Sequence, residues 1–118
     1  MIVSTNRRFV AELIEKRTEQ AHEPGFQVMV FEWDEEKRLT NIEKHGIDFI
    51  DADILFGSPH LVAPGKTVDG EQRWLAIGMI DEIYVTAVFT RCDSVIRMIS
   101  MRSARNGERK RHQEVFGN

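Results

Sequence analysis

The chain has 118 residues, of which 42% are hydrophobic and 30% are charged, a balance typical of a globular protein and not of a disordered one. This length corresponds to about one domain, which can bury roughly two thirds of its unfolded surface without disulfides or metals. The single cysteine, Cys92, excludes an internal disulfide and a cysteine-based zinc site. Because no apolar stretch could span a bilayer and the N-terminus lacks a signal-peptide pattern, we expect a cytoplasmic protein without a membrane partner.

Charge is distributed unevenly along the chain. The net charge is −3, yet the segment from Arg91 to the C-terminus carries seven basic and three acidic residues, whereas the residues before it carry nine basic and sixteen acidic. A basic C-terminal third predicts contact with an anionic partner. The alternative interpretation is a solvated helix face with a few ion pairs.

The first predicted element is a helix over residues 7–21. Asn6 is a plausible N-cap, and a Pro-Gly pair at residues 24–25 would end the segment. Four apolar residues would share one face of this helix: Phe9, Val10, Leu13 and Ile14. With so small an apolar face, the helix would pack loosely or against a partner chain.

A strand and a helical hairpin are predicted next. Residues 27–33 are rich in Val, Phe and Trp and predict a strand. Asp34 caps a following helix whose inner face holds Leu39 and Ile42 and which ends at Gly46. Asp48 would cap a second, short helix, and the two helices make residues 34–57 a hairpin. The short helix would bury Phe49, Ala52, Leu55 and Phe56.

After residue 59 the hydrophobic period changes to two, which predicts strands joined by short turns. The expected strands span residues 60–64, 73–80, 83–90 and 95–100, with a polar loop at 65–70. A basic helix from Ser103 to about Phe116 closes the chain. The predicted fold class is therefore α+β: an antiparallel β-sheet meander packed with a helical hairpin and a C-terminal helix.

Familiar catalytic motifs are absent from the sequence. It contains no glycine-rich phosphate loop, no His-Glu-x-x-His and no serine or cysteine nucleophile motif. The four histidines are not at metal-ligand spacing, so we expect no metal site and no cofactor. His45, at a helix end, is interpreted as a capping or surface residue.

Arginines are the more informative residues, because several lie on or beside three consecutive predicted strands. They are Arg73, Arg91, Arg97, Arg102 and Arg105. On neighbouring strands, residues of one parity share a face, so several guanidinium groups could converge there and bind a phosphodiester. The alternative is that each arginine only keeps an exposed sheet face soluble.

Three further residues are candidates for the site. His112 lies among basic residues on the C-terminal helix, where neighbouring cations would help it to titrate near neutrality as a general acid or base. Its alternative is a solvated surface histidine. Trp74 should point away from Arg73, as a core residue or as an RNA contact. Glu71 is a reserve candidate for proton transfer.

Four phrases of the sequence, taken together and in order, resemble a known family. They are 31–46, with Phe-Glu-Trp-Asp and Lys-His-Gly; 49–59, ending in Phe-Gly-Ser-Pro; 70–78, Gly-Glu-Gln-Arg-Trp-Leu-Ala-Ile-Gly; and 96–104, Ile-Arg-Met-Ile-Ser-Met-Arg-Ser-Ala. Over residues 30–114 the chain resembles the BrnT family, the toxin half of BrnT–BrnA type II toxin–antitoxin systems. The resemblance implies that 29–118 form the toxin domain and 1–28 an N-terminal extension with one helix, with Met29 as an alternative start.

The resemblance also implies a RelE-like fold, ribonuclease activity, and a DNA-binding BrnA antitoxin that neutralises the toxin and lets the pair repress its own operon. We therefore expect a metal-independent endoribonuclease that cleaves RNA by attack of the 2′-hydroxyl and inhibits translation. Operator DNA would be contacted only through the antitoxin. The expected catalytic residues are Arg73, Arg97, Arg102 and His112, and the expected RNA-binding residues are Arg91, Arg105 and Trp74.

Two other classes of function remain open on the sequence. One is a non-catalytic module that binds the antitoxin through its basic face and has a degenerate active site. The other is direct nucleic-acid binding within a repressor complex.

Overall fold

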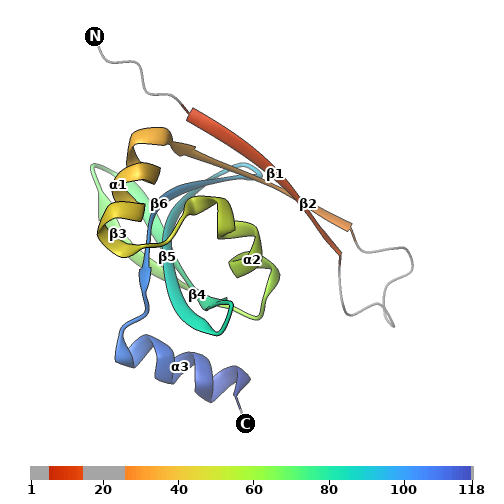
Figure 1. Ribbon diagram of the computed structural model, residues 1–118, viewed down its shortest axis with the longest axis vertical. Coiled ribbons are helices and arrows are strands. Elements are labelled where there is room, and N and C mark those ends of the chain that lie inside the picture. Colours follow the sequence, from red (N-terminus) through yellow and green to blue (C-terminus); the bar gives the residue numbers. More distant parts are fainter. Residues whose placement is uncertain (1–5, 15–25, 118) are drawn as a thin grey trace.

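The computed structural model of the protein describes residues 6–14 and 26–117 and places them in an α+β fold (Figure 1). In the described residues one sheet has the strand order β1-β2-β6-β5-β4-β3. Its strands are β1 (Asn6–Ile14), β2 (Phe26–Asp34), β3 (Leu61–Val68), β4 (Glu71–Ile80), β5 (Ile83–Cys92) and β6 (Val95–Ser103). The helical elements are α1 (Glu35–His45), the 3₁₀ turn η1 (Phe49–Asp51), α2 (Ala52–Gly57) and α3 (Asn106–Phe116). No helix among these residues is long and apolar enough to cross a membrane.

The first described segment is a strand, so the predicted helix over residues 7–21 is wrong for its part up to Ile14. The rest of that prediction lies outside the described residues. β1 pairs antiparallel with β2 along its whole length, from Asn6 opposite Asp34 to Ile14 opposite Phe26. The reason is tertiary: β2 offers a free backbone edge, and pairing along that edge overrides a weak local helix preference.

The sheet is mixed, which corrects the expectation of a purely antiparallel one. The meander from β3 to β6 is antiparallel as predicted, but β2 pairs with β6 in parallel. This parallel ladder is short, with Val30 opposite Val95 and Glu32 opposite Arg97. It joins the first part of the chain to the last strand of the meander, a long-range pairing that local sequence patterns do not reveal.

The backbone conformation of the turn residues explains how consecutive strands of the meander are joined. Asp81 and Glu82 both have positive φ, 49° and 71°, as the tight turn between β4 and β5 requires. The predicted polar loop at 65–70 is mostly wrong, because β3 continues to Val68. A register shift between Pro64 and Thr67 interrupts its ladder with β4. Such a bulge tolerates proline, which has no N–H to donate, and lets the strand resume beyond it.

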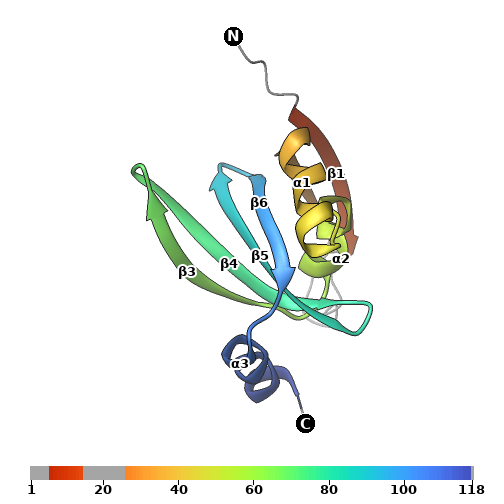
Figure 2. The same cartoon turned by 60° about the vertical axis from the view of Figure 1, so that its left-hand side comes forward.

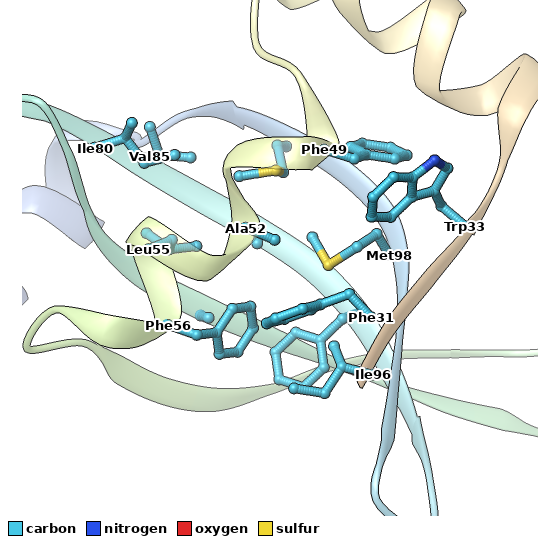
Figure 3. Packing of buried hydrophobic residues seen from close by; sticks show 14 residues of the cluster. Phe31, Trp33, Phe49, Ala52, Leu55, Phe56, Ile80, Val85, Ile96 and Met98 are labelled. Atoms are coloured by element: carbon cyan, nitrogen blue, oxygen red, sulfur yellow. The ribbon is translucent and has the colours of Figure 1, made fainter. Parts of the chain in front are cut away.

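The hydrophobic core lies between the sheet and the short helix α2 (Figure 3). All four inward positions predicted for the short helical segment are buried. Phe56 is central: its ring lies 5.5 Å from that of Phe31 on β2 and 5.2 Å from that of Phe89 on β5. Figure 2 shows α1 and α2 on one side of β5 and β6, with α3 beyond the strand ends.

Helix α1 begins and ends as predicted but presents a different face to the sheet. Asp34 accepts a hydrogen bond from Glu36 N at 2.9 Å, and Gly46 adopts φ 72°. Leu39, expected to face inward, is 55% exposed, whereas Asn41 is only 5% exposed. The prediction failed because a polar residue makes the contact with β6.

Asn41 attaches α1 to β6 because its side chain forms the two backbone hydrogen bonds that a neighbouring strand would form. Its side-chain amide donates to Met101 O at 2.9 Å and accepts from Met101 N at 3.1 Å. It also donates to Ile47 O at 3.0 Å. The buried amide therefore has its hydrogen bonds satisfied, and β6 gains a partner where β2 no longer pairs with it.

Replacing Asn41 should destabilise the folded protein. We expect Asn41→Ala to lower the free energy of unfolding by about 2–4 kcal/mol, because it leaves buried backbone groups of β6 without partners. Leu39→Ala, at an exposed position of the same helix, is the matched control and should change stability by less than about 0.5 kcal/mol. Urea denaturation followed by circular dichroism measures both. Equal losses in the two variants would contradict the assigned role of Asn41.

Candidate functional site

The sheet has a second face, turned away from the core, which we call the outer face. By register, it carries Glu32, Arg73, Leu75, Ile77, Thr86, Val88, Thr90, Arg97, Ser100 and Arg102. Arg97 lies opposite Thr90 and Arg102 lies opposite Thr86. These two arginines have opposite parity along β6, and they share a face because the ladder shifts register after Val88.

Glu108, at the start of α3, organises one end of the outer face. Arg102 donates two parallel hydrogen bonds to its carboxylate, at 2.9 and 3.0 Å. Thr86 Oγ1 and Arg105 N donate to the same carboxylate, both at 2.8 Å. The side chains of Arg102 and Glu108 are only 18% and 16% exposed. One carboxylate therefore joins β5, β6 and the first turn of α3.

These hydrogen bonds lower the pKa of Glu108 from 4.5 to about 2. The bonds from Arg102 contribute most; those from Arg105 N and Thr86 add to them, and partial burial opposes them. A carboxylate with this pKa is ionised at neutral pH, so it can orient the Arg102 guanidinium but does not accept a proton there.

Arg97 and Arg73 occupy the other end of the outer face. Arg97 Nη1 donates to Glu32 on β2 at 3.0 Å. Arg73 lies one position beyond the Trp74–Phe89 pair, which places it beside Thr90. Within the described residues, its Nε is buried and has no hydrogen-bond partner. A buried guanidinium nitrogen without an acceptor is costly, so this position calls for an explanation beyond stability.

A groove of about 520 Å³ adjoins Arg102 between the β3–β4 hairpin and α3. Its floor is apolar and is formed by Leu61, Val62, Ala63, Leu75 and Ile77. Arg105, Arg111 and Glu108 line its side on α3. An apolar floor with cationic edges suits a flat, uncharged ring attached to an anionic backbone.

His112 is buried, with 6% exposure, in contrast to the alternative of a solvated surface residue. Its Nε2 donates to Pro59 O at 2.9 Å, which fixes the proton on that nitrogen. The ring lies 5.4 Å from that of Tyr84 and 4.8 Å from that of Phe116. In this position His112 attaches α3 to the loop before β3.

The remaining predicted site residues differ in where they lie. Arg91 lies on the core side of the sheet, over the ring of Trp74 at 5.6 Å, so the five arginines do not share one face. Trp74 is partly buried and packs against the core, the first of the two alternatives given for it. Arg105 is exposed at the N-cap of α3, which begins at Asn106 and not at the predicted Ser103. Glu71 is exposed two residues before Arg73.

Sequence reasoning missed Glu108, Glu32 and Thr86. One signal existed for Glu108: it stands three residues after the helix N-cap, where a carboxylate commonly accepts the N-cap N–H. Glu32 and Thr86 gave no local signal, because their partners are distant in sequence. In the part of the chain that the structure describes, no three His, Cys, Asp or Glu residues cluster as a metal site would need.

The pKa of Glu108 makes stability depend on pH. Because the folded-state pKa lies below the ordinary value of 4.5, the ionised carboxylate stabilises the fold above about pH 5, and this stabilisation is lost as the pH falls toward 2. We expect the wild type to lose about 3 kcal/mol more than Glu108→Gln over this range, where Asp48, whose pKa is also lowered, contributes to the loss in both proteins. Urea unfolding measured at several pH values tests this. Parallel pH profiles for the two proteins would contradict it.

Comparison with known proteins identifies the family. The sequence profile of the family described as "Ribonuclease toxin, BrnT, of type II toxin-antitoxin system" matches residues 33–108. The 1.1 Å crystal structure of the Brucella abortus ribonuclease toxin BrnT is 42% identical, with a TM-score of 0.53, and the alignment covers 63% of this chain and 94% of that one. A search among curated proteins finds no match.

The matched residues include the strands that carry Arg73, Arg97 and Arg102, together with Glu108. Because the family profile covers more than half of the chain, this protein belongs to the BrnT family of ribonuclease toxins of type II toxin–antitoxin systems.

Proposed function

We propose that this protein is a metal-independent endoribonuclease that cleaves RNA on the outer face of its sheet and thereby inhibits translation. The observation that carries the proposal is the placement of Arg73, Arg97 and Arg102 on one face, with the buried Nε of Arg73 lacking a partner among the described residues. Arginines held in this way suit a phosphodiester, whose oxygens accept hydrogen bonds from planar donors.

The proposed reaction is attack of the RNA 2′-oxygen on the adjacent phosphorus. A P–O2′ bond forms and the P–O5′ bond breaks, giving a 2′,3′-cyclic phosphate and a free 5′-hydroxyl. The 2′-hydroxyl proton passes to a base, and another proton passes to the 5′-oxygen. Negative charge builds on the phosphate oxygens in the transition state, where preorganised arginines stabilise it.

Ion pairing orients these arginines. Arg102 donates two hydrogen bonds to Glu108, and Arg97 Nη1 donates to Glu32 at 3.0 Å. A guanidinium has five N–H groups, more than the two hydrogen bonds that Arg102 directs to Glu108 require. Glu71 is exposed and lies on the same strand as Arg73 with the same parity, which supports Glu71 as the acceptor of the 2′-hydroxyl proton.

Replacing Arg97 tests the proposal. We expect Arg97→Ala to lower the rate of RNA cleavage by roughly 10²–10³, because it removes a donor that faces the developing charge. Lys110→Ala, which removes an exposed positive charge from α3, is the control and should retain activity. Cleavage of a labelled RNA by purified protein gives the rates, and thermal unfolding checks that each variant is folded.

Two results would overturn this assignment. If Arg97→Ala cleaves RNA like the wild type, Arg97 is not in the site. If the wild type never cleaves RNA and Arg97→Ala instead weakens antitoxin binding, the protein is the non-catalytic binding module.

His112 has a test of its own. We infer from its burial and its hydrogen bond to Pro59 O that it anchors α3. We expect His112→Phe, which keeps a ring beside Tyr84, to lower stability by about 1 kcal/mol and to leave the pH profile of cleavage unchanged. A fall in cleavage of about 10²–10⁴ with unchanged stability would instead identify His112 as the acid or base.

The proposed partner is a BrnA-like, DNA-binding antitoxin that neutralises the toxin and through which alone the pair contacts operator DNA. Membership of a type II toxin family supports a protein antitoxin.

The RelE-like relationship of the fold is part of the same proposal and is supported by the antiparallel meander packed with a helical hairpin. Assignment of residues 29–118 as the toxin domain, with 1–28 as an extension, also remains a proposal. So do RNA contacts by Arg91, Arg105 and Trp74.

A further inference from the structure

Helix α1 and strand β6 run side by side beyond the point where β2 stops pairing with β6, and a groove of about 320 Å³ lies between them. Its lining residues are Glu36, Lys37, Thr40, Asn41, Lys44, His45, Ile99 and Ser100. Seven of these eight residues have polar side chains and Ile99 is aliphatic, while polar and apolar atoms share the groove surface about equally. Lysine, threonine and serine side chains are among the groups with which proteins contact the phosphates of a nucleic acid.

The basic residues of the groove lie along one face of α1. Lys37, Lys44 and His45 are separated from the buried Asn41 by three or four residues, which is the spacing of neighbours on a helix surface. Because Asn41 is hydrogen-bonded to Met101, this face is turned toward β6.

These cations differ from Arg38, the other basic residue of α1. Arg38 is paired with Glu35 at 2.6 Å and with Asp48 at 2.8 Å. Within the part of the chain that the structure describes, Lys37 and Lys44 take part in no ion pair. The groove therefore presents uncompensated lysines, with Glu36 as the one acidic group in its lining.

The groove is continuous with the outer face through Ser100. This residue pairs with Val88, between the Arg97–Thr90 and Arg102–Thr86 pairs. A step of two residues along a strand is roughly 7 Å, so Ser100 lies about one such step from Arg102. An RNA chain whose scissile phosphate contacts the outer-face arginines could therefore continue into the groove.

We propose that the groove between α1 and β6 binds the backbone phosphate of a nucleotide that flanks the cleaved bond, through Lys37, Lys44 and His45. The inference rests on the proposed ribonuclease function and extends its site from the sheet to α1. These residues are binding residues: they hold the RNA in register with the arginines and take no part in proton transfer.

The test measures the binding of an uncleavable RNA. The probe is a fluorescein-labelled oligonucleotide of about 12 nucleotides with 2′-O-methyl groups throughout, which lacks the attacking hydroxyl. Fluorescence anisotropy at several salt concentrations gives the slope of log affinity against log salt. We expect Lys37→Gln and Lys44→Gln each to weaken binding and to reduce that slope by roughly 0.7, the value for one lost phosphate contact on a single strand. Lys110→Gln, an exposed helical lysine outside the groove, is the matched control and should leave the slope unchanged.

The outcomes separate this inference from the proposed function. If the wild type cleaves RNA and Arg97→Ala does not, but the groove variants bind like the wild type, the groove inference is wrong and the ribonuclease proposal stands. If the groove variants lose RNA binding while the wild type never cleaves, the groove binds RNA and the ribonuclease proposal fails. If the control loses as much slope as the groove variants, binding is diffuse and the groove inference is wrong. If the groove variants lose antitoxin binding and keep RNA binding, the occupant is the protein partner, which also overturns the inference.

Discussion

The carboxylate of Glu108 is the constraint on which the outer face depends. It receives hydrogen bonds from the side chains of Arg102 and Thr86 and from the first turn of α3, so it fixes the helix to the sheet and the guanidinium to the helix at once. An ionised carboxylate that is this little exposed is tolerable only because all these donors converge on it. Loss of any one of them would loosen both the groove beside α3 and the orientation of Arg102.

A second buried polar group, the amide of Asn41, likewise fixes a helix to the sheet, because it holds α1 against the backbone of β6. Strand β6 needs a partner after β2 turns away into α1, and an apolar helix face could not supply hydrogen bonds to its backbone. Asn41 supplies them from within a helix. The same contact sets how close α1 lies to β6 and turns Lys37 and Lys44 toward the groove between them.

With Glu108 and Asn41 as anchors, the arginines of the site are oriented in advance, and their positive charge is only partly neutralised by carboxylates. Arg97 and Arg102 are held by carboxylates, which restricts their rotamers before any substrate arrives. Arg73 differs, because its buried Nε lacks an acceptor among the described residues. The hydrophobic core, built around Phe56, lies on the other side of the sheet, so changes to the outer face need not disturb it.

The sequence by itself determined the elements whose signals are local: the caps of α1 at Asp34 and Gly46, the buried face of η1 and α2, the tight turn at Asp81, and the α+β class. It also carried the family motifs. Only the tertiary structure decided that residues 6–14 form a strand, that β2 joins β6 in parallel, and that Arg97 and Arg102 share a face while Arg91 does not. The physical reason is the same in each case: strand pairing and the register shift after Val88 depend on backbone partners far away in the chain, which no local pattern of side chains encodes.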